Sequence, residues 1–368
     1  MPQVLSLIES LKNYEKLVHE FQFRDRIKSA EYHYATPFEF DGFFEDSIVE
    51  MLFDKMKLIS KEVEFVSFKL GVTWPSGSSD VEKSHLKHSI QTPLIVRLTS
   101  IGKTIGSTIP DAEFLIDFEK KLLFLRLRSV YIMGKYTKHV RDIAQTEYFC
   151  NKCRGKGCWY CLNTGHFSKE SVEQLLAEKM VPALKAKLLI LHGAGREDLD
   201  VLMLKKGRPF IAELLMPLKR SADLGALEKE INSSFKGKIS VSSLAFCSTH
   251  DVAPLKDSLH EKIYAACIVS DKNVNPKELE LNKIIEVSQN TPSRVESRRA
   301  HLQRKKTVEL LSVGLISQKE FVLKLKTSHG TYVKEFISGD SGKTSPSISS
   351  MLGANCTCKL LDVMEICD

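Results

Sequence analysis

The chain has 368 residues, which is too long for one hydrophobic core, so we expect two or three domains. Its hydrophobic content of 43% and charged content of 27% are typical of a soluble globular protein, with no repeat or low-complexity tract. No apolar run is long enough to span a bilayer, which argues against an integral membrane protein.

Residues 1–22 are expected to form an amphipathic helix, because Leu5, Ile8, Leu11 and Leu17 recur at roughly helical spacing. Charges are mixed into this stretch, and it has neither the apolar core nor the small-residue cleavage site of a signal peptide. We therefore expect a cytoplasmic protein with no membrane partner. A monomer is the expected oligomeric state.

Strand-like segments alternate with polar breaks between residues 48 and 144. The segments are EVEFVSFKLGV, TPLIVRLTS and AEFLIDFEKKLLFLRLRSVYI, and the intervening WPSGSSD is typical of a loop. This alternation predicts a compact α+β domain in the first part of the chain.

Two C-x-x-C pairs follow this domain, formed by Cys150, Cys153, Cys158 and Cys161. Glycines between the pairs allow a tight reversal, and four thiolates suit a structural zinc ion with no open coordination position. A reduced, metal-free loop and a redox pair are the alternatives. The CxxCxGxG core also occurs in zinc domains of J-type co-chaperones, but those carry the motif several times. The odd total of nine cysteines argues against a disulfide framework.

From residue 168 onward, the sequence predicts helices among many short strands. Residues 168–185 are expected to form a helix that Ser168 caps, and a polar helix is expected near 222–233. The predicted strands are LLILHG, DVLML, RPFIAELLM, KISVSSLAF, KIYAACIVS, VELLSVGLI and FVLKLKT. Their hairpin-like spacing favours a mixed, largely antiparallel sheet over regular βαβ units.

The stretch LLILHGAGREDLDVLML (188–204) places four charged residues between two apolar segments. It lacks the Walker Lys-Ser/Thr and the Rossmann glycine spacing, and no other glycine-rich fingerprint offers a site for NAD, ATP or S-adenosylmethionine. What remains is Asp198, a carboxylate at a bend between two strands, beside Arg196. A lone aspartate in a turn is usually a structural cap, which is the alternative interpretation.

Two basic segments favour contact with nucleic acid in a chain whose net charge is +7. Residues 294–306 hold six Lys or Arg against one acid, and residues 126–141 interleave basic residues with Tyr131 and Tyr136. Either segment alone fits a solvated helix face. Together they favour a groove that follows phosphates and stacks bases on aromatic rings.

GREDLDVLML followed by GRPFIAELL resembles the catalytic segment of pseudouridine synthases. The chain is most similar to the archaeal and eukaryotic tRNA pseudouridine-54/55 synthase family, the tenth of the Pus series. Further similar blocks occur in the family's order: GKYTKHVRDIAQTEY, CNKCRGKGCWYCLNTG with SVEQLL, LHEKIYAACIV, TPSRVESRRAHLQRKK and GTYVKEFISGDSGKTSPS. The resemblance covers roughly residues 130–368 and is looser before them.

The resemblance implies an α+β protein in three parts. These are a THUMP-containing RNA-binding domain over residues 1–147, a four-cysteine zinc knuckle over 148–166, and a pseudouridine synthase catalytic domain over 167–368. It implies an isomerase that converts uridine to pseudouridine in the TΨC arm of tRNA, at position 54, 55 or both. tRNA would be the partner, zinc would be structural, and catalysis would need no cofactor.

The resemblance also assigns roles to single residues. Asp198 falls at the position of the essential catalytic aspartate, Tyr264 at that of a tyrosine that stacks on the target base, and Lys334 at that of a basic partner of the aspartate. Leu352 falls where an apolar residue lines the pocket, and Arg196 is expected to position the RNA backbone. An ionised carboxylate can assist the isomerisation by attacking the sugar or base, or by taking a proton.

These side chains also have structural interpretations. Tyr264 fits a core position in a half-buried strand, Lys334 an exposed position on a short helix, and Leu352 core packing. Arg196 could instead pair with a neighbouring acid.

The chain departs from the family pattern at several positions. The family usually has an arginine where Leu202 stands, GxG where this chain has LKKG (204–207), and an asparagine and an arginine around Pro217. NYEKLV stands where many members carry an N-terminal C-x-x-C. Since the proposed active-site residues are retained, we expect activity to persist. The affinity for RNA, or the tRNA position that is modified, is expected to differ from that of other members.

Two other functions fit parts of the sequence. A non-catalytic RNA-binding protein could use the N-terminal domain and the knuckle in tRNA folding or processing. A THUMP-linked methyltransferase is disfavoured, because no cofactor loop is found.

Overall fold

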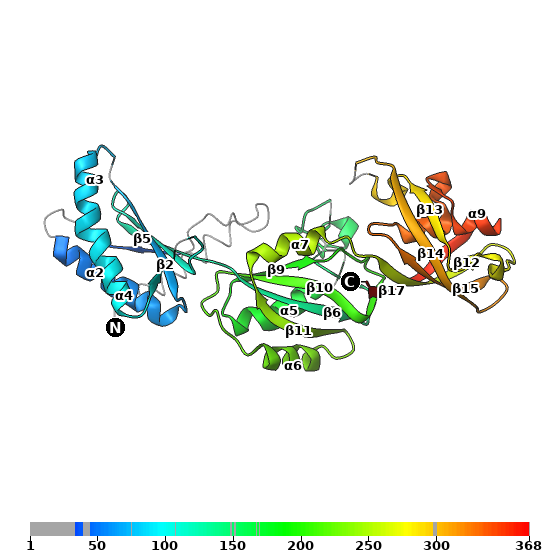
Figure 1. Ribbon diagram of the computed structural model, residues 1–368, viewed down its shortest axis with the longest axis horizontal. Coiled ribbons are helices and arrows are strands. Elements are labelled where there is room, and N and C mark those ends of the chain that lie inside the picture. Colours follow the sequence, from blue (N-terminus) through cyan, green and yellow to red (C-terminus); the bar gives the residue numbers. More distant parts are fainter. Residues whose placement is uncertain are drawn as a thin grey trace. The chain divides into compact units, whose positions relative to one another are not determined.

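The computed structural model describes residues 34–39, 45–74, 76–106, 108–147, 149–150, 152–166, 168, 170–296 and 300–367. The helix expected over residues 1–22 lies outside them. The chain divides into two compact units, each described by itself below (Figure 1). The first is Met1–Val130 with Met180–Leu189 and Glu213–Ala222, and the second is Tyr131–Lys179 with Ile190–Ala212 and Asp223–Asp368. Within the described residues, no helix combines the length and apolar character needed to cross a membrane.

The first unit is built on a five-stranded mixed sheet in the order β1-β5-β4-β2-β3. Its strands are β1 (Tyr34–Pro37), β2 (Ser67–Thr73), β3 (Thr104–Ile105), β4 (Ala112–Asp117) and β5 (Leu122–Leu127). Its helices are α2 (Glu45–Glu62), α3 (Asp80–Leu86) and α4 (Thr92–Ser100), with a π-helical turn at Lys87–Gln91. They gather on one side of the sheet (Figure 1), and Leu52, Met56, Phe68 and Phe114 pack between them and the strands.

One strand prediction in this unit is wrong, because TPLIVRLTS forms helix α4. Pro93 stands in the first turn of the helix, where its missing N–H costs no hydrogen bond. Leu94 and Leu98 are fully buried one helical turn apart. A strand that buried these two leucines would also bury Val96 on the same face, but Val96 is 61% exposed.

The second unit is built on a ten-stranded sheet in the order β11-β6-β10-β17-β12-β15-β14-β13-β16, with β9 paired to β10. Its strands are β6 (Val130–Lys138), β9 (Leu188–Gly193), β10 (Leu202–Leu215), β11 (Ile239–Cys247), β12 (Lys262–Ser270), β13 (Ile284–Gln289), β14 (Arg304–Leu315), β15 (Glu320–Thr327), β16 (Thr344–Ser345) and β17 (Cys356–Ile366). Strands β10 and β17 run parallel, whereas β12 is antiparallel to both of its neighbours. The predicted α+β fold with a mixed, largely antiparallel sheet is therefore confirmed.

Short helices flank this sheet. They are α5 (Val172–Ala183), α6 (Leu224–Ser234), α7 (Val252–Asp257), α8 (Val333–Ser338) and α9 (Ile348–Leu352), and a small parallel pair joins β7 (Ile143–Ala144) to β8 (Glu170–Ser171). The polar helix predicted near 222–233 is confirmed as α6. The predicted cap at Ser168 is wrong, because the hydroxyl of Ser171 accepts the N–H of Gln174 at 3.1 Å as α5 begins.

The segments DVLML and RPFIAELLM belong to one long strand, β10. Gly207 stands between them with φ +76°, and a Cβ at this position would lie 2.7 Å from the carbonyl oxygen of Tyr136 in β6. A glycine is therefore needed where β10 passes close to β6, beside the segment that carries the candidate site.

We expect Gly207→Ala to lower the free energy of unfolding by about 1–3 kcal/mol, because alanine is strained at positive φ and its Cβ would clash with β6. Urea or thermal denaturation measures this change. The matched control is Gly314→Ala in β14, where φ is not positive and an added Cβ meets no atom within 4 Å. An equal loss in both variants would contradict the steric explanation.

Candidate active site and metal centre

A bend between β9 and β10 carries the candidate active site. The chain leaves β9 at Gly193 and enters β10 at Leu202. Gly195 has φ +80°, and a Cβ there would lie 3.1 Å from Nη1 of the buried Arg208. Asp198 follows, with 44% of its side chain exposed. The predicted bend between two apolar strands is thus present, and its glycine allows the backbone to pass directly over an arginine.

A buried polar network holds this bend from inside the unit. Nε of Arg208 lies 2.7 Å from Oε2 of Glu197, and both side chains are almost completely buried. The contact is a close ion pair and not a well-aligned hydrogen bond. The hydroxyl of Tyr136 donates to Oε1 of Glu197 at 2.7 Å, and Gln145 donates to both Tyr136 Oη and the carbonyl of Gly195. Burial and the Glu197 charge raise the pKa of Tyr136 well above its ordinary value.

Further cations bind the backbone of the bend. Lys138, at the end of β6, is fully buried and donates from Nζ to the carbonyls of Asp198 and Leu199 at 3.4 and 3.1 Å. Arg141 donates to the carbonyl of Asp200 at 2.6 Å and pairs with Asp362 of β17 at 2.7 Å. The carbonyls of Asp198 and Leu199 also accept the backbone N–H groups of Val201 and Asp142, each at 3.1 Å, so the two cations add further hydrogen bonds to an already bonded bend.

These contacts correct one expectation from the sequence. Residues 126–141 were expected to offer basic and aromatic side chains to RNA, but Lys138 and Tyr136 have no exposed surface. Both form hydrogen bonds inside the unit, so at these two positions the basic segment supports the bend that carries Asp198.

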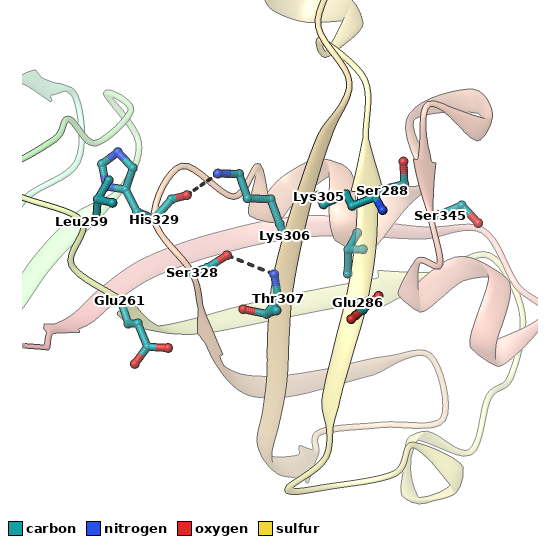
Figure 2. Close-up of a pocket in the computed structure, with 11 residues that line it drawn as sticks. Leu259, Glu261, Glu286, Ser288, Lys305, Lys306, Thr307, Ser328, His329 and Ser345 are labelled. Carbon is teal, nitrogen blue, oxygen red and sulfur yellow. Dashed lines mark hydrogen bonds between the residues drawn. The ribbon is translucent and has the colours of Figure 1, made fainter. Parts of the chain in front are cut away.

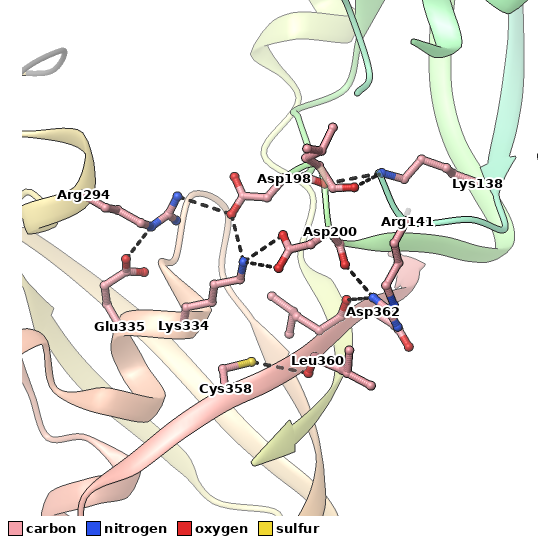
Figure 3. A network of polar contacts seen from close by, with 12 residues as sticks. Lys138, Arg141, Asp198, Asp200, Arg294, Lys334, Glu335, Cys358, Leu360 and Asp362 are labelled. Carbon is pink, nitrogen blue, oxygen red and sulfur yellow. Dashed lines mark hydrogen bonds and ion pairs between the residues drawn. The ribbon is translucent and has the colours of Figure 1, made fainter. Parts of the chain in front are cut away.

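Two cations from the C-terminal part of the unit reach the carboxylates of the bend. Nζ of Lys334, on α8, lies 3.5 Å from Oδ2 of Asp198 and 2.9 and 3.0 Å from the two carboxylate oxygens of Asp200. Nη1 of Arg294 lies 3.3 Å from Asp198, and its Nε donates to Glu335 at 2.6 Å. Figure 3 shows both cations pointing toward the bend from separate segments.

Charge and burial compete within this cluster. Partial burial opposes ionisation of Asp200, but the hydrogen bonds and charge of Lys334 outweigh it, and the pKa of Asp200 lies below its ordinary value. Burial also opposes the charged form of Arg294, which would lower its pKa. The hydrogen bonds and charges of Glu335 and Asp198 outweigh burial, so the pKa of Arg294 is raised. The cluster therefore keeps Asp200 and Arg294 in their charged forms.

Tyr264 lies close to the same charges. It stands in β12, opposite Leu325 of β15 and Val363 of β17, and its side chain is half-buried. Burial raises the pKa of Tyr264 to about 12, where the charge of Arg208 opposes the rise and those of Glu197 and Asp198 add to it. The phenol therefore remains neutral and protonated, and its ring lies within electrostatic range of the bend.

The sequence singled out Asp198, Lys334 and Tyr264. The structure pairs Asp198 with Lys334 and places Tyr264 within electrostatic range of Asp198. Arg196 is exposed on the bend, and Leu352 is half-buried at the end of α9, a helix that packs against α8. Sequence reasoning missed Arg294 as a partner of the aspartate and treated it as one member of a basic segment. No sequence motif links Arg294 to Asp198, because the two residues are far apart in the chain. Arg294 does belong to the TPSRVESRRAHLQRKK block that resembles the family.

The four cysteines of the C-x-x-C pairs form a second site. Their sulfur atoms all lie within 4.8 Å of one another, and three of the separations are 3.7–3.8 Å. A zinc–sulfur distance of about 2.3 Å in a tetrahedron requires sulfur–sulfur separations of about 3.8 Å. Burial would raise the pKa of Cys161, but the N–H groups of Cys158 and Gly165 donate to its sulfur and lower the pKa to about 6. The cluster could therefore hold a metal ion.

The cysteine segment also presents an exposed aromatic and basic surface. Trp159 is 77% exposed and contacts Tyr160 edge to face, with ring centroids 5.7 Å apart. Nζ of Lys152 lies 4.5 and 4.3 Å from the centres of these two rings. Since residues 149–166 contain no acidic side chain, the surface is positively charged.

Comparison with known proteins identifies the family. The sequence model described as "Pus10, C-terminal" matches residues 131–367. The chain belongs to the Pus10 family. A protein of Methanocaldococcus jannaschii named tRNA pseudouridine synthase Pus10 is 36% identical over 342 residues, covering 89% of this chain and 74% of that protein. A protein of the same name from Korarchaeum cryptofilum is 37% identical over 342 residues, covering 89% and 91%.

The family indicated by the sequence blocks is therefore confirmed, and the bend, Tyr264, Lys334 and the four cysteines all lie within the region matched to Pus10. Among solved structures, a chain in the crystal structure of a Cbf5-Nop10-Gar1 complex is similar with a TM-score of 0.31 and 14% identity. That similarity covers 52% of this chain and 44% of the other, and it is too low to add to the assignment.

We expect Glu197→Gln to lower the free energy of unfolding by about 3–5 kcal/mol, because it leaves the charge of Arg208 buried without a partner. Chemical denaturation near neutral pH measures the loss. The control Glu280→Gln removes an exposed ion pair with Lys283 and should change stability by less than about 1 kcal/mol. A Glu197→Gln protein as stable as this control would contradict the role of the ion pair.

Proposed function

We propose that this protein is a tRNA pseudouridine synthase that isomerises uridine in the TΨC arm, at position 54, 55 or both. The observation that carries the proposal is Asp198, a partly exposed carboxylate at a braced bend, placed between Lys334 and Arg294 in a chain of the Pus10 family. Relatives that cover most of the chain bear the name of this activity.

The isomerisation of uridine requires few catalytic side chains. The N-glycosidic bond must break, the uracil must rotate, and the ring must rejoin the sugar through carbon, with no net oxidation and no group lost. Asp198 is the catalytic carboxylate, which attacks the sugar or base or takes a proton. Lys334 and Arg294 lie 3.5 and 3.3 Å from its Oδ2, so two positive charges face the proposed catalytic group.

Tyr264 is proposed to hold the target base. A uridine must leave its stack before a carboxylate can reach the sugar, and an aromatic face can receive the exposed base. Because its phenol is neutral, the ring of Tyr264 can stack on uracil without bringing a second negative charge beside Asp198. Confinement of the detached uracil favours its return over its escape. Leu352 is proposed to line the pocket, and Arg196 to position the RNA backbone.

The remaining parts are proposed to bind tRNA. The THUMP-containing domain over residues 1–147 and the knuckle over 148–166 would hold the folded RNA, with the catalytic domain over 167–368. Trp159 and Tyr160 offer ring faces, and Lys152 a charge, to a phosphate backbone and its bases. The protein is proposed to act as a cytoplasmic monomer without a catalytic cofactor.

The decisive test compares two aspartates that share one lysine. We expect Asp198→Asn to reduce pseudouridine formation on a T-arm transcript by at least about 10³-fold, with RNA affinity nearly unchanged. Asp200→Asn should retain measurable activity, reduced by about tenfold, because Lys334 then loses a positioning partner. Single-turnover assays and equilibrium binding on the same RNA provide both measurements.

Activity that survives in Asp198→Asn would overturn its assignment as the catalytic residue. If the wild-type protein binds tRNA but forms no pseudouridine in any transcript, the non-catalytic RNA-binding alternative replaces the proposal.

The four cysteines are proposed to hold one structural zinc ion. We expect metal analysis of the purified protein to find about one zinc per chain, and Cys153→Ser to lose it, because three thiolates bind zinc less tightly than four. Cys247→Ser, outside the cluster, is the control and should keep the metal. A metal-free wild-type protein of full thermal stability would contradict the zinc proposal.

A further inference from the structure

A buried lysine beside the catalytic bend lies next to positive and neutral groups. Lys262, the first residue of β12, is 7% exposed, and its Nζ donates to the carbonyl oxygen of His260 at 3.0 Å. Among the described residues, no ion pair joins Lys262 to an acid. Burial and the charge of Arg208 lower the pKa of Lys262 to about 8. Since a buried ammonium without a counter-charge destabilises a fold, its presence points to a ligand of negative charge.

The position of Lys262 connects it to the reaction centre. It stands two residues before Tyr264 on the same strand. Its Cε lies 3.8 Å from the place that a Cβ would occupy at Gly195, in the bend that carries Asp198. An anion held by Lys262 would therefore lie beside the reacting nucleotide.

A pocket of about 590 Å³ lies beside the end of the neighbouring strand (Figure 2). Lys262 is opposite Thr327 of β15, and the two residues that follow Thr327 line the pocket. Lys305, Lys306, Ser328 and His329 are among its lining residues, and Nζ of Lys306 donates to the carbonyl of His329 at 2.7 Å. Nδ1 of His329 is buried and has no hydrogen-bond partner in the described structure. Burial together with the charges of Lys262, Lys306 and His260 lowers the pKa of His329, so these groups lie near one another.

Two acids also line the pocket, but they are directed elsewhere. Glu261 pairs with Lys326 at 2.5 Å, and Glu286 stands on β13 opposite Thr307. Figure 2 shows both carboxylates pointing away from the end where Lys306 meets His329. The end of the pocket where Lys306 meets His329 therefore offers donors and positive charge, and neither lining carboxylate points toward it.

We propose that Lys262, Lys306 and His329 form a subsite for a backbone phosphate of the RNA, adjacent to the nucleotide that reacts. Phosphate oxygens would accept from Lys262 Nζ and from a ring N–H of His329, and the phosphate charge would compensate Lys262. This inference rests on the proposed function for its choice of RNA. The subsite fixes the register of the strand, so that one uridine and not its neighbour faces Asp198.

The test replaces the lysine with a side chain of similar length. Lys262→Met should bind a T-arm RNA about tenfold more weakly, and the slope of log affinity against log salt should fall by about one. Its melting temperature should equal or exceed that of the wild type, because methionine removes an uncompensated buried charge. Lys262→Arg should restore the salt slope. The control is Lys359→Met, an exposed lysine paired with Glu320 at 2.9 Å, which should leave affinity and slope unchanged.

A second arm locates the phosphate. Single neutral methylphosphonate linkages are placed in turn through the T arm. One linkage beside the target uridine should weaken binding to the wild type about tenfold, and it should have no further effect on Lys262→Met. Unchanged affinity and slope in Lys262→Met, or equal losses of stability and affinity, would overturn the subsite. Because binding is measured apart from isomerisation, a wild type that binds but does not isomerise would reject the proposed activity alone.

Discussion

The buried ion pair between Glu197 and Arg208 is the constraint on which the candidate site depends. Removing two charges from water is costly, so the pair persists only where close contact and further hydrogen bonds compensate. Tyr136 and Gln145 supply these bonds and reach from Glu197 to the backbone of the bend. Since Glu197 is directed inward, the next residue, Asp198, is left on the accessible side of the same bend. The geometry of the carboxylate is thus set by its buried neighbour.

Cations contact the bend on two sides, and the two groups of cations bind different parts of it. Lys138 and Arg141 bind its carbonyl oxygens, which fixes the backbone. Lys334 and Arg294 form ion pairs with its carboxylates. Two acids close together in the bend would repel each other, and cations from separate segments offset that repulsion. Fixed charges of this kind also need little rearrangement when a reaction begins.

The surfaces proposed to bind RNA differ in kind from this hydrogen-bonded interior. The cysteine segment offers exposed rings and a positive charge, and stacking on aromatic rings accepts any base. Lys262 instead offers a buried charge at one fixed point beside the bend. A surface of the first kind increases affinity, whereas a point of the second kind determines which nucleotide is presented.

The sequence by itself determined the family, the four-cysteine cluster, most strands of the second unit, and Asp198 at a bend. Alternating burial, C-x-x-C spacing and an interrupted apolar run are local patterns, so they can be read without coordinates. Only the tertiary structure decided that TPLIVRLTS is a helix, that Tyr136 and Lys138 serve the interior, and that Arg294 reaches the aspartate. The burial of a polar group and its choice of partner depend on contacts between residues far apart in the chain. Those contacts form only when the sheet aligns its strands. For this reason Tyr136 and Lys138 fit RNA contacts in the sequence, whereas in the fold they support the bend through buried hydrogen bonds.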